Sequence, residues 1–186
     1  LTLRTEGGAV KPEGVPFFGV ILAFVLAGVW WWRSYDSVTF DEPDGLQFMQ
    51  PQIEKGANRF GQRTARLRAD ELQPLDIVRF QVGRAKNKVL TGRVIALEGQ
   101  RVRMEGAKIF VDDKEIQDPY VRYKNKNEFY PELIVPAGCV FVLNDLRGRK
   151  GADRWDSRNL GPIAFRSIQH RFSPSEAKAY TRRRGS

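Results

Sequence analysis

Apolar residues form one long uninterrupted run near the start of the chain. Residues 15–32 (VPFFGVILAFVLAGVWWW) carry no charge, and Arg33 closes the run. As a helix with a rise of 1.5 Å per residue, the run would be about 27 Å long, which approaches the hydrocarbon thickness of a bilayer. The apolar region of a cleaved signal peptide is usually shorter and is followed by small residues, whereas this run ends in three tryptophans. The pattern predicts an uncleaved transmembrane helix over residues 15–33.

Small residues recur at every fourth position within this run. At that spacing they share one helix face and allow a second transmembrane helix to approach closely. The tryptophans at the end of the run are of the type that anchors a helix at a membrane surface. We expect membrane packing or interface roles for Gly19, Ala23, Ala27, Trp30, Trp31 and Trp32.

Basic groups are more frequent before the run than directly after it. Arg4, Lys11 and the terminal amine precede it, whereas Arg33 is the one basic residue in the 20 positions that follow, among four acidic residues. The positive-inside rule then places the N-terminus in the cytoplasm. We expect a single-pass protein of the inner or plasma membrane, with its larger domain on the periplasmic or outer side.

Beyond the run, short β-rich segments, several with alternating apolar and polar residues, are typical of β-strands. Asp112 and Asp113 separate two of these segments and suit a hairpin turn. Because no long segment has a helical period, we expect a mainly β fold, an antiparallel sheet or barrel. The predicted strands lie at residues 77–82, 89–97, 101–104, 108–111, 140–143 and 163–165.

These patterns divide the chain into five expected parts. A tail precedes the helix, a juxtamembrane segment follows it, and a β domain and a basic tail complete the chain. The expected boundaries are 1–14, 15–33, 34–57, 58–172 and 173–186.

Composition excludes several kinds of chemistry. One cysteine among 186 residues rules out an internal disulfide and a multi-cysteine metal site, and one histidine rules out motifs that need two imidazoles. We therefore expect no metal and no cofactor. The net charge of +9 permits contact with anionic lipid, since residues 143–186 hold eleven basic and four acidic side chains. No nucleic-acid-binding motif is present, so we expect no nucleic acid partner.

Five segments occur in the order found in the type I signal peptidases. The clearest, residues 92–100 (GRVIALEGQ), resembles the family segment Lys-Arg-Val-Ile-Gly-Leu-Pro-Gly-Asp, and residues 135–147 resemble Val-Pro-Glu-Gly followed by Phe-Val-Met-Gly-Asp-Asn-Arg. The other three are residues 73–80, 108–114 and 156–163. The resemblance implies a signal-peptidase-like antiparallel β domain on an N-terminal membrane helix. In that family a serine nucleophile is activated by a neutral lysine base.

Both catalytic positions depart from the family pattern. The family has a lysine directly before Arg-Val-Ile, and this chain has Gly92 at that position. Residues 43–49 (PDGLQFM) match the family's nucleophile segment more loosely, and this match places Leu46 where the family has its serine. A serine hydroxyl is a poor nucleophile without a positioned base, so the resemblance implies an inactive homologue.

No other residue in the sequence is an obvious substitute. Lys88 would lie about 13 Å from position 92 along an extended strand, which is too far to replace the missing amine. His170 lies in a basic stretch that does not bring it near Ser157, and Cys139 lies in an apolar strand where a buried, inert thiol is expected.

Other family positions are retained, and we interpret them as scaffold. They are Arg93, Gly99, Asp145, Arg147, Asp156, Ser157, Arg158 and Gly161. The loop between Arg147 and Asp156 is longer than is usual in the family. Because arginine and tryptophan are enriched at interfaces, this loop is a candidate partner contact through Arg149, Arg154 and Trp155.

The function predicted from these observations is a non-catalytic membrane subunit. It would stabilise or assemble a larger membrane protein complex, for instance an energy-converting or photosynthetic one, with the lipid bilayer and other subunits as partners. Two alternatives remain open: a module that binds peptides of exported proteins, and a residual signal-peptidase-like protease.

Overall fold

The computed structural model describes residues 17–39, 58–63, 68–83, 88–106, 108–121, 127–147 and 155–173. The chain divides into two compact units, Leu1–Arg33 and Ser34–Ser186.

The apolar run forms the helix α1, Phe17–Ser34. Its large apolar side chains are exposed within the chain, from 40% at Val20 to 75% at Trp32. The predicted transmembrane helix is not supported, because no helix among the described residues is both long and apolar enough to cross a membrane. The first two residues of the predicted span lie outside the described residues.

The second unit is mainly β, as the alternating pattern predicted. Among the described residues, its larger sheet has seven strands in the order β1-β2-β11-β3-β4-β9-β10, and a smaller sheet has the order β7-β6-β5-β8. Every strand pair that the structure describes is antiparallel. The larger sheet comprises β1 (Tyr35–Thr39), β2 (Asn58–Arg63), β3 (Ile77–Gln81), β4 (Val89–Ala96), β9 (Cys139–Leu143), β10 (Ile163–Ala164) and β11 (Ile168–Phe172). The smaller sheet comprises β5 (Arg101–Glu105), β6 (Lys108–Val111), β7 (Lys114–Glu115) and β8 (Phe129–Ile134).

Short helical turns connect these strands. They are the 3-10 turns η3 (Ala69–Glu71) and η5 (Phe165–Ser167) and the single α-turn α2 (Ser157–Leu160). The predicted hairpin joins β6 to β7, where Asp112 and Asp113 have positive φ angles of 49° and 63°. β1 lies within the segment expected to be juxtamembrane and pairs with β2 along its whole length.

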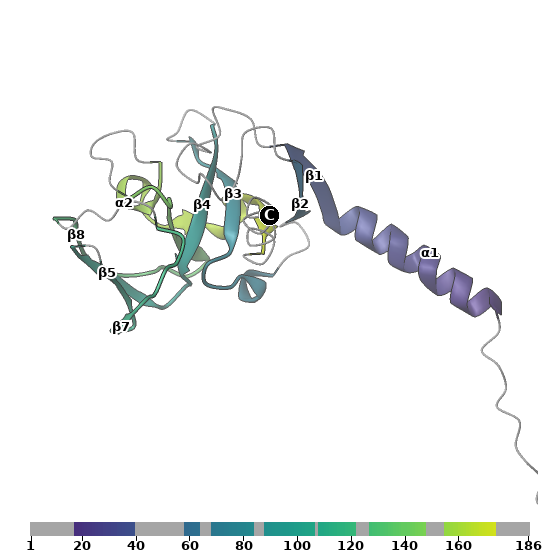
Figure 1. Cartoon of the computed structure of the whole chain (residues 1–186), viewed down its shortest axis with the longest axis horizontal. Coiled ribbons are helices and arrows are strands. Elements are labelled where there is room, and N and C mark those ends of the chain that lie inside the picture. Colours follow the sequence, from purple (N-terminus) through teal and green to yellow (C-terminus); the bar gives the residue numbers. More distant parts are fainter. Residues whose placement is uncertain are drawn as a thin grey trace, which may run out of the picture. The chain divides into compact units, whose positions relative to one another are not determined.

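Strand β4 lies between β3 and β9 in the larger sheet. Figure 1 shows it beside β3. It contributes to two apolar cores. Leu90 and Val94 belong to the first core, together with Val78 and Phe80 of β3, whereas Ile95 belongs to the second. The second core is shared with the smaller sheet through Val102, Met104, Ile109 and Val111. Both faces of β4 are therefore covered, which explains why its residues are buried from Leu90 to Ala96.

Candidate functional site

Gly92 lies in the middle of β4, at the position that the resemblance assigns to the general base. It pairs with Val78 of β3 and is buried. A Cβ atom built on Gly92 would collide with Cγ1 of Val142 and would lie 3.4 Å from the carbonyl oxygen of Leu143. The space beside the backbone of Gly92 is thus filled by a valine from the neighbouring strand.

Two polar groups border this position. The side-chain oxygen of Asn144 would lie 3.6 Å from the same Cβ atom, and it has no hydrogen-bond partner among the described residues although Asn144 is only 2% exposed. The Ser157 hydroxyl accepts a hydrogen bond of 2.8 Å from the backbone N–H of Val142 and is fully buried. The Ser157 hydroxyl therefore joins α2 to β9, and its family role as scaffold stays a prediction.

Arg93, the next residue along β4, points to the opposite face and forms a buried ion pair. Its Nε and Nη2 atoms donate to the two carboxylate oxygens of Asp145 at 2.8 and 2.7 Å, and both side chains are fully buried. Nη1 donates to the carbonyl oxygen of Leu75, and the guanidinium lies 3.9 Å from the ring centroid of Tyr120. Burial raises the pKa of Asp145, and the hydrogen bonds from Arg93 oppose that rise.

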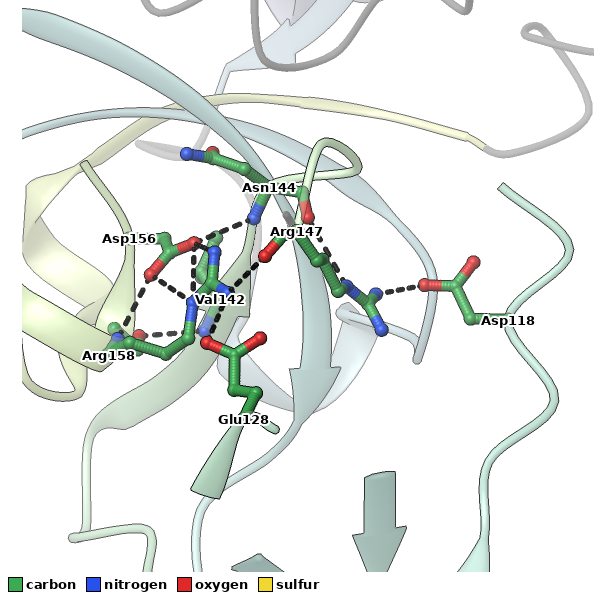
Figure 2. A network of polar contacts seen from close by, with 8 residues as sticks. Asp118, Glu128, Val142, Asn144, Arg147, Asp156 and Arg158 are labelled. Atoms are coloured by element: carbon green, nitrogen blue, oxygen red, sulfur yellow. Dashed lines mark hydrogen bonds and ion pairs between the residues drawn. The ribbon is translucent and has the colours of Figure 1, made fainter. Parts of the chain in front are cut away.

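A second buried network joins α2 to the start of β8 (Figure 2). Asp156 caps α2 by accepting from the backbone N–H of Arg158 and also accepts from the backbone N–H of Asn144 at 3.2 Å. Arg158 lies between Asp156 and Glu128, and its Nη1 donates to Glu128 at 2.8 Å. All three of the paired side chains are at most 5% exposed.

Arg147 extends this network on its other side. Its Nη2 atom donates to Asp118, and its Nε atom donates to the carbonyl oxygen of Asn144 at 3.3 Å (Figure 2). Burial lowers the pKa of Arg147, and the charges of Asp118 and Asp145 oppose this effect. The retained acidic and basic residues are therefore occupied in holding β9, α2 and the loop before β8 together.

The retained glycines have backbone conformations that favour glycine. Gly99 has a φ of 76° and Gly161 a φ of 77°. Gly161 ends α2, where its N–H donates to the carbonyl oxygen of Ser157.

Other candidates from the sequence lie apart from Gly92. The ammonium group of Lys88 lies 5.5 Å from the ring centroid of Trp155. Trp155 is half-buried and packs against the first core, so its role in partner contact stays a prediction. His170 contacts Asp36 of β1 through Nε2 at 3.2 Å. Cys139 begins β9 and is half-buried.

Some predicted positions remain without a structural test. Leu46, Arg149 and Arg154 lie outside the described residues. Gly19, Ala23 and Ala27 are exposed on α1, and their role in helix packing stays a prediction. Among the described residues, no three His, Cys, Asp or Glu side chains come together as a metal site requires.

Sequence reasoning missed the partners of the retained residues. Asp118 and Glu128 lie outside the resembling segments, yet they pair with Arg147 and Arg158. Asp76 is fully buried, and burial raises its pKa while its contact with Nε of Arg171 at 2.6 Å opposes the rise. The sequence offered one signal for the burial of Asp76, because this charged residue directly precedes the apolar strand β3.

The structure is an antiparallel β domain whose core contains the buried ion pair of Arg93 and Asp145. Residues 16–173 match the model of the family described as signal peptidase, peptidase S26. The chain therefore belongs to the signal peptidase family, peptidase S26.

Known relatives include proteins with and without the word inactive in their names. Signal peptidase I of Bacillus caldolyticus is 32% identical over 110 residues, which cover 52% of this chain and 57% of that protein. Inactive signal peptidase IA of Staphylococcus aureus (strain COL) is 28% identical over 127 residues, 64% of this chain and 68% of that protein. A solved signal peptidase I from Enterococcus faecalis V583 has a TM-score of 0.47 at 22% identity and is matched over 55% of this chain and 97% of that one. The match thus spans little more than half of the Bacillus caldolyticus protein.

Proposed function

We propose that this chain is a catalytically silent member of the signal peptidase family. The observation that carries the proposal is the position of Gly92, where the family pattern requires a lysine. Gly92 has no side chain, and Val142 fills the adjacent space. Without a base at this position, a serine hydroxyl would keep its proton and attack a peptide bond too slowly for useful turnover.

The surroundings of Gly92 support this proposal, because the nearby candidates for Ser–Lys chemistry are engaged elsewhere. The Ser157 hydroxyl accepts from the Val142 backbone, and the ammonium group of Lys88 lies over the ring of Trp155. Loss of one member of a nucleophile–base pair typically costs several orders of magnitude in rate, and loss of the second adds little. The absence of a serine at Leu46 is a prediction from the sequence and is consistent with the same conclusion.

Complementation tests the proposal. A bacterial strain depleted of its own signal peptidase I would receive either this chain or signal peptidase I of Bacillus caldolyticus, matched for abundance in the membrane fraction. We expect the Bacillus protein to restore preprotein processing and this chain to leave unprocessed preproteins. Restored processing by this chain, abolished by Ser157→Ala or Lys88→Ala, would overturn the proposal.

We further propose that the silent domain acts as a membrane-associated subunit of a larger assembly. The exposed apolar side chains of α1 support this role. A continuous apolar surface on a protein typically marks a region that lipid or another protein covers. Native purification after mild solubilisation tests the role. Recovery of stoichiometric partners, lost when Phe24 and Leu26 are changed to Ser, would support it, and recovery of the chain alone from the aqueous fraction would contradict it.

A further inference from the structure

A groove lies beyond the C-terminal end of β4, beside Leu97 and Glu98. Its deeper part has a volume of about 290 Å³, and the side chains of Leu97, Val140 and Phe165 give it apolar walls. These residues belong to or pack against the first core, so the hollow opens onto the main apolar interior. Leu97 lies five residues beyond Gly92, about 17 Å along an extended strand, so this groove is separate from the emptied base position.

A second hollow of about 480 Å³ continues the first. Gly138, Cys139 and Phe165 line both hollows, while Ala164 and Arg166 line only the second. The two hollows therefore adjoin each other and form one groove at the edge of the larger sheet, where β9 pairs with β10.

Hydrogen bonds between distant segments hold the floor of the groove. The backbone N–H of Gly138 donates to Oε2 of Glu98 at 2.6 Å, and its carbonyl oxygen accepts from the N–H of Phe165 at 2.8 Å. No atom lies within 4 Å of the Cβ position at Gly138, whose φ is +68°, so this residue faces open space. A preformed floor of this kind reduces the ordering cost of binding a ligand.

The two ends of the groove carry opposite charges. Asp70 and Glu98 line the deeper hollow, whereas Arg166 lines the other end. Arg68 pairs with Asp70, but the two side chains are 78% and 65% exposed. Because an exposed ion pair is weak, a cationic group of a ligand can replace Arg68 beside Asp70. A cationic group is thus favoured beside the apolar hollow and disfavoured at the far end.

We propose that this groove binds an extended peptide segment in which an apolar side chain neighbours a basic one. The apolar side chain enters the hollow between Leu97, Val140 and Phe165, and the basic group lies beside Glu98 and Asp70. A pocket of this volume is at the lower end of the range for small ligands and accommodates one side chain rather than a folded partner. The proposal is independent of the loss of catalysis, because it uses no residue of the family site.

The single cysteine of the chain provides a reporter, because Cys139 lines both hollows. The rate at which a disulfide reagent modifies Cys139 is measured on the full chain with the peptides acetyl-Leu-Lys-Leu-amide, acetyl-Leu-Glu-Leu-amide and acetyl-Ser-Lys-Ser-amide. We expect the first peptide to slow modification in a saturable manner and the other two to have little effect at the same concentration. Fluorescence anisotropy of the same peptides with a dansyl label gives a second measure that does not depend on the reactivity of the thiol.

Matched variants localise the binding. Glu98→Gln keeps an oxygen that can accept from the N–H of Gly138 but removes the negative charge. Combined with Asp70→Asn, this change is expected to weaken binding of acetyl-Leu-Lys-Leu-amide by about two- to tenfold. The same change at an exposed acid of the other sheet, Glu115→Gln, is expected to leave binding unchanged. Equal binding of all three peptides, or no binding of the Lys peptide at about 10 mM in either measurement, would overturn the proposal.

Discussion

The side chain of Val142 occupies the space that a side chain on Gly92 would need. The two residues belong to neighbouring strands, and Val142 is fully buried in the first core. A side chain at position 92, which the resemblance assigns to the general base, would therefore disturb the packing of the sheet. A lysine would fit at this position only if Val142 moved or became smaller.

This relationship predicts the stability of variants at position 92. Gly92→Ala should lower the free energy of unfolding by about 1–3 kcal/mol, because the new methyl group overpacks the core. In a Val142→Ala background the same change should cost much less, since the valine methyl group that it meets is gone. Urea unfolding followed by tryptophan fluorescence measures both effects.

Gly83→Ala is the matched control for this cycle. No atom lies within 4 Å of the Cβ position at Gly83, so its substitution should change stability little. Additive effects of Gly92→Ala and Val142→Ala would mean that the two positions do not compete for space.

The buried pair of Arg93 and Asp145 should be costly to break. Asp145→Ala leaves the guanidinium of Arg93 uncompensated in the interior and should destabilise the fold by about 3–5 kcal/mol. The double variant Arg93→Met with Asp145→Leu should be considerably more stable than Asp145→Ala, because no buried charge remains. Glu115→Ala removes the exposed ion pair of Glu115 with Lys108 and should cost at most about 1 kcal/mol. Equal costs for Asp145→Ala and Glu115→Ala in urea unfolding would refute this assignment.

Asp156 should contribute more to stability than Glu128, although both pair with Arg158. Asp156 also caps α2 and accepts from the backbone N–H of Asn144, whereas Glu128 meets Arg158 from one side. Asp156→Asn should therefore lower the unfolding temperature more than Glu128→Gln does. The reverse order in a calorimetric scan would show that the contact with β8 dominates the network.

The ion pair of Asp36 with Arg63 predicts a dependence on acid. Hydrogen bonding from Arg63 lowers the pKa of Asp36 in the folded chain, and the contact with His170 acts in the same direction. The folded state therefore holds the charged carboxylate more strongly than the unfolded state does. This contribution to stability is complete above about pH 4 and is lost as the pH falls through the folded pKa.

The measurement compares Asp36→Asn with its parent, both in a His170→Gln background so that the contact of Asp36 with Arg63 is tested without the contact with His170. The difference in unfolding temperature should be constant between about pH 7 and 5 and should shrink below about pH 4. A difference that grows in acid would contradict the lowered pKa of Asp36.

Much of the fold followed from the alternation of apolar and polar residues. The segments at 77–82 and 101–104 became β3 and β5 with small shifts at their ends, and the two aspartates of the predicted hairpin form the turn between β6 and β7. These elements are determined by local pattern and turn chemistry, which a sequence displays directly.

Long-range pairings were not predictable in the same way. β1 and β2 contain several polar residues and gave no clear strand signal, yet they pair with each other and join the sheet through β11. The length of the apolar run also predicted a membrane span, whereas no helix among the described residues is both long and apolar enough to cross a membrane.

For the site, order and spacing of the motifs predicted the family, which the family model confirms. The family roles of Gly92 and the retained residues stay predictions. The motifs could not reveal that Val142 fills the space at Gly92, or that Asp118 and Glu128 neutralise Arg147 and Arg158. Those relationships depend on which side chains meet across strands that lie far apart in the sequence.

Cleavage of a preprotein by the purified chain tests the central claim most directly. The full chain and signal peptidase I of Bacillus caldolyticus would be incubated with the same preprotein in phospholipid micelles, and the products would be identified by their N-terminal masses. We expect complete processing by the Bacillus protein. With this chain we expect no more processed product than in buffer without either protein. A product cut at a single site by this chain, and lost on one substitution near Gly92, would contradict it.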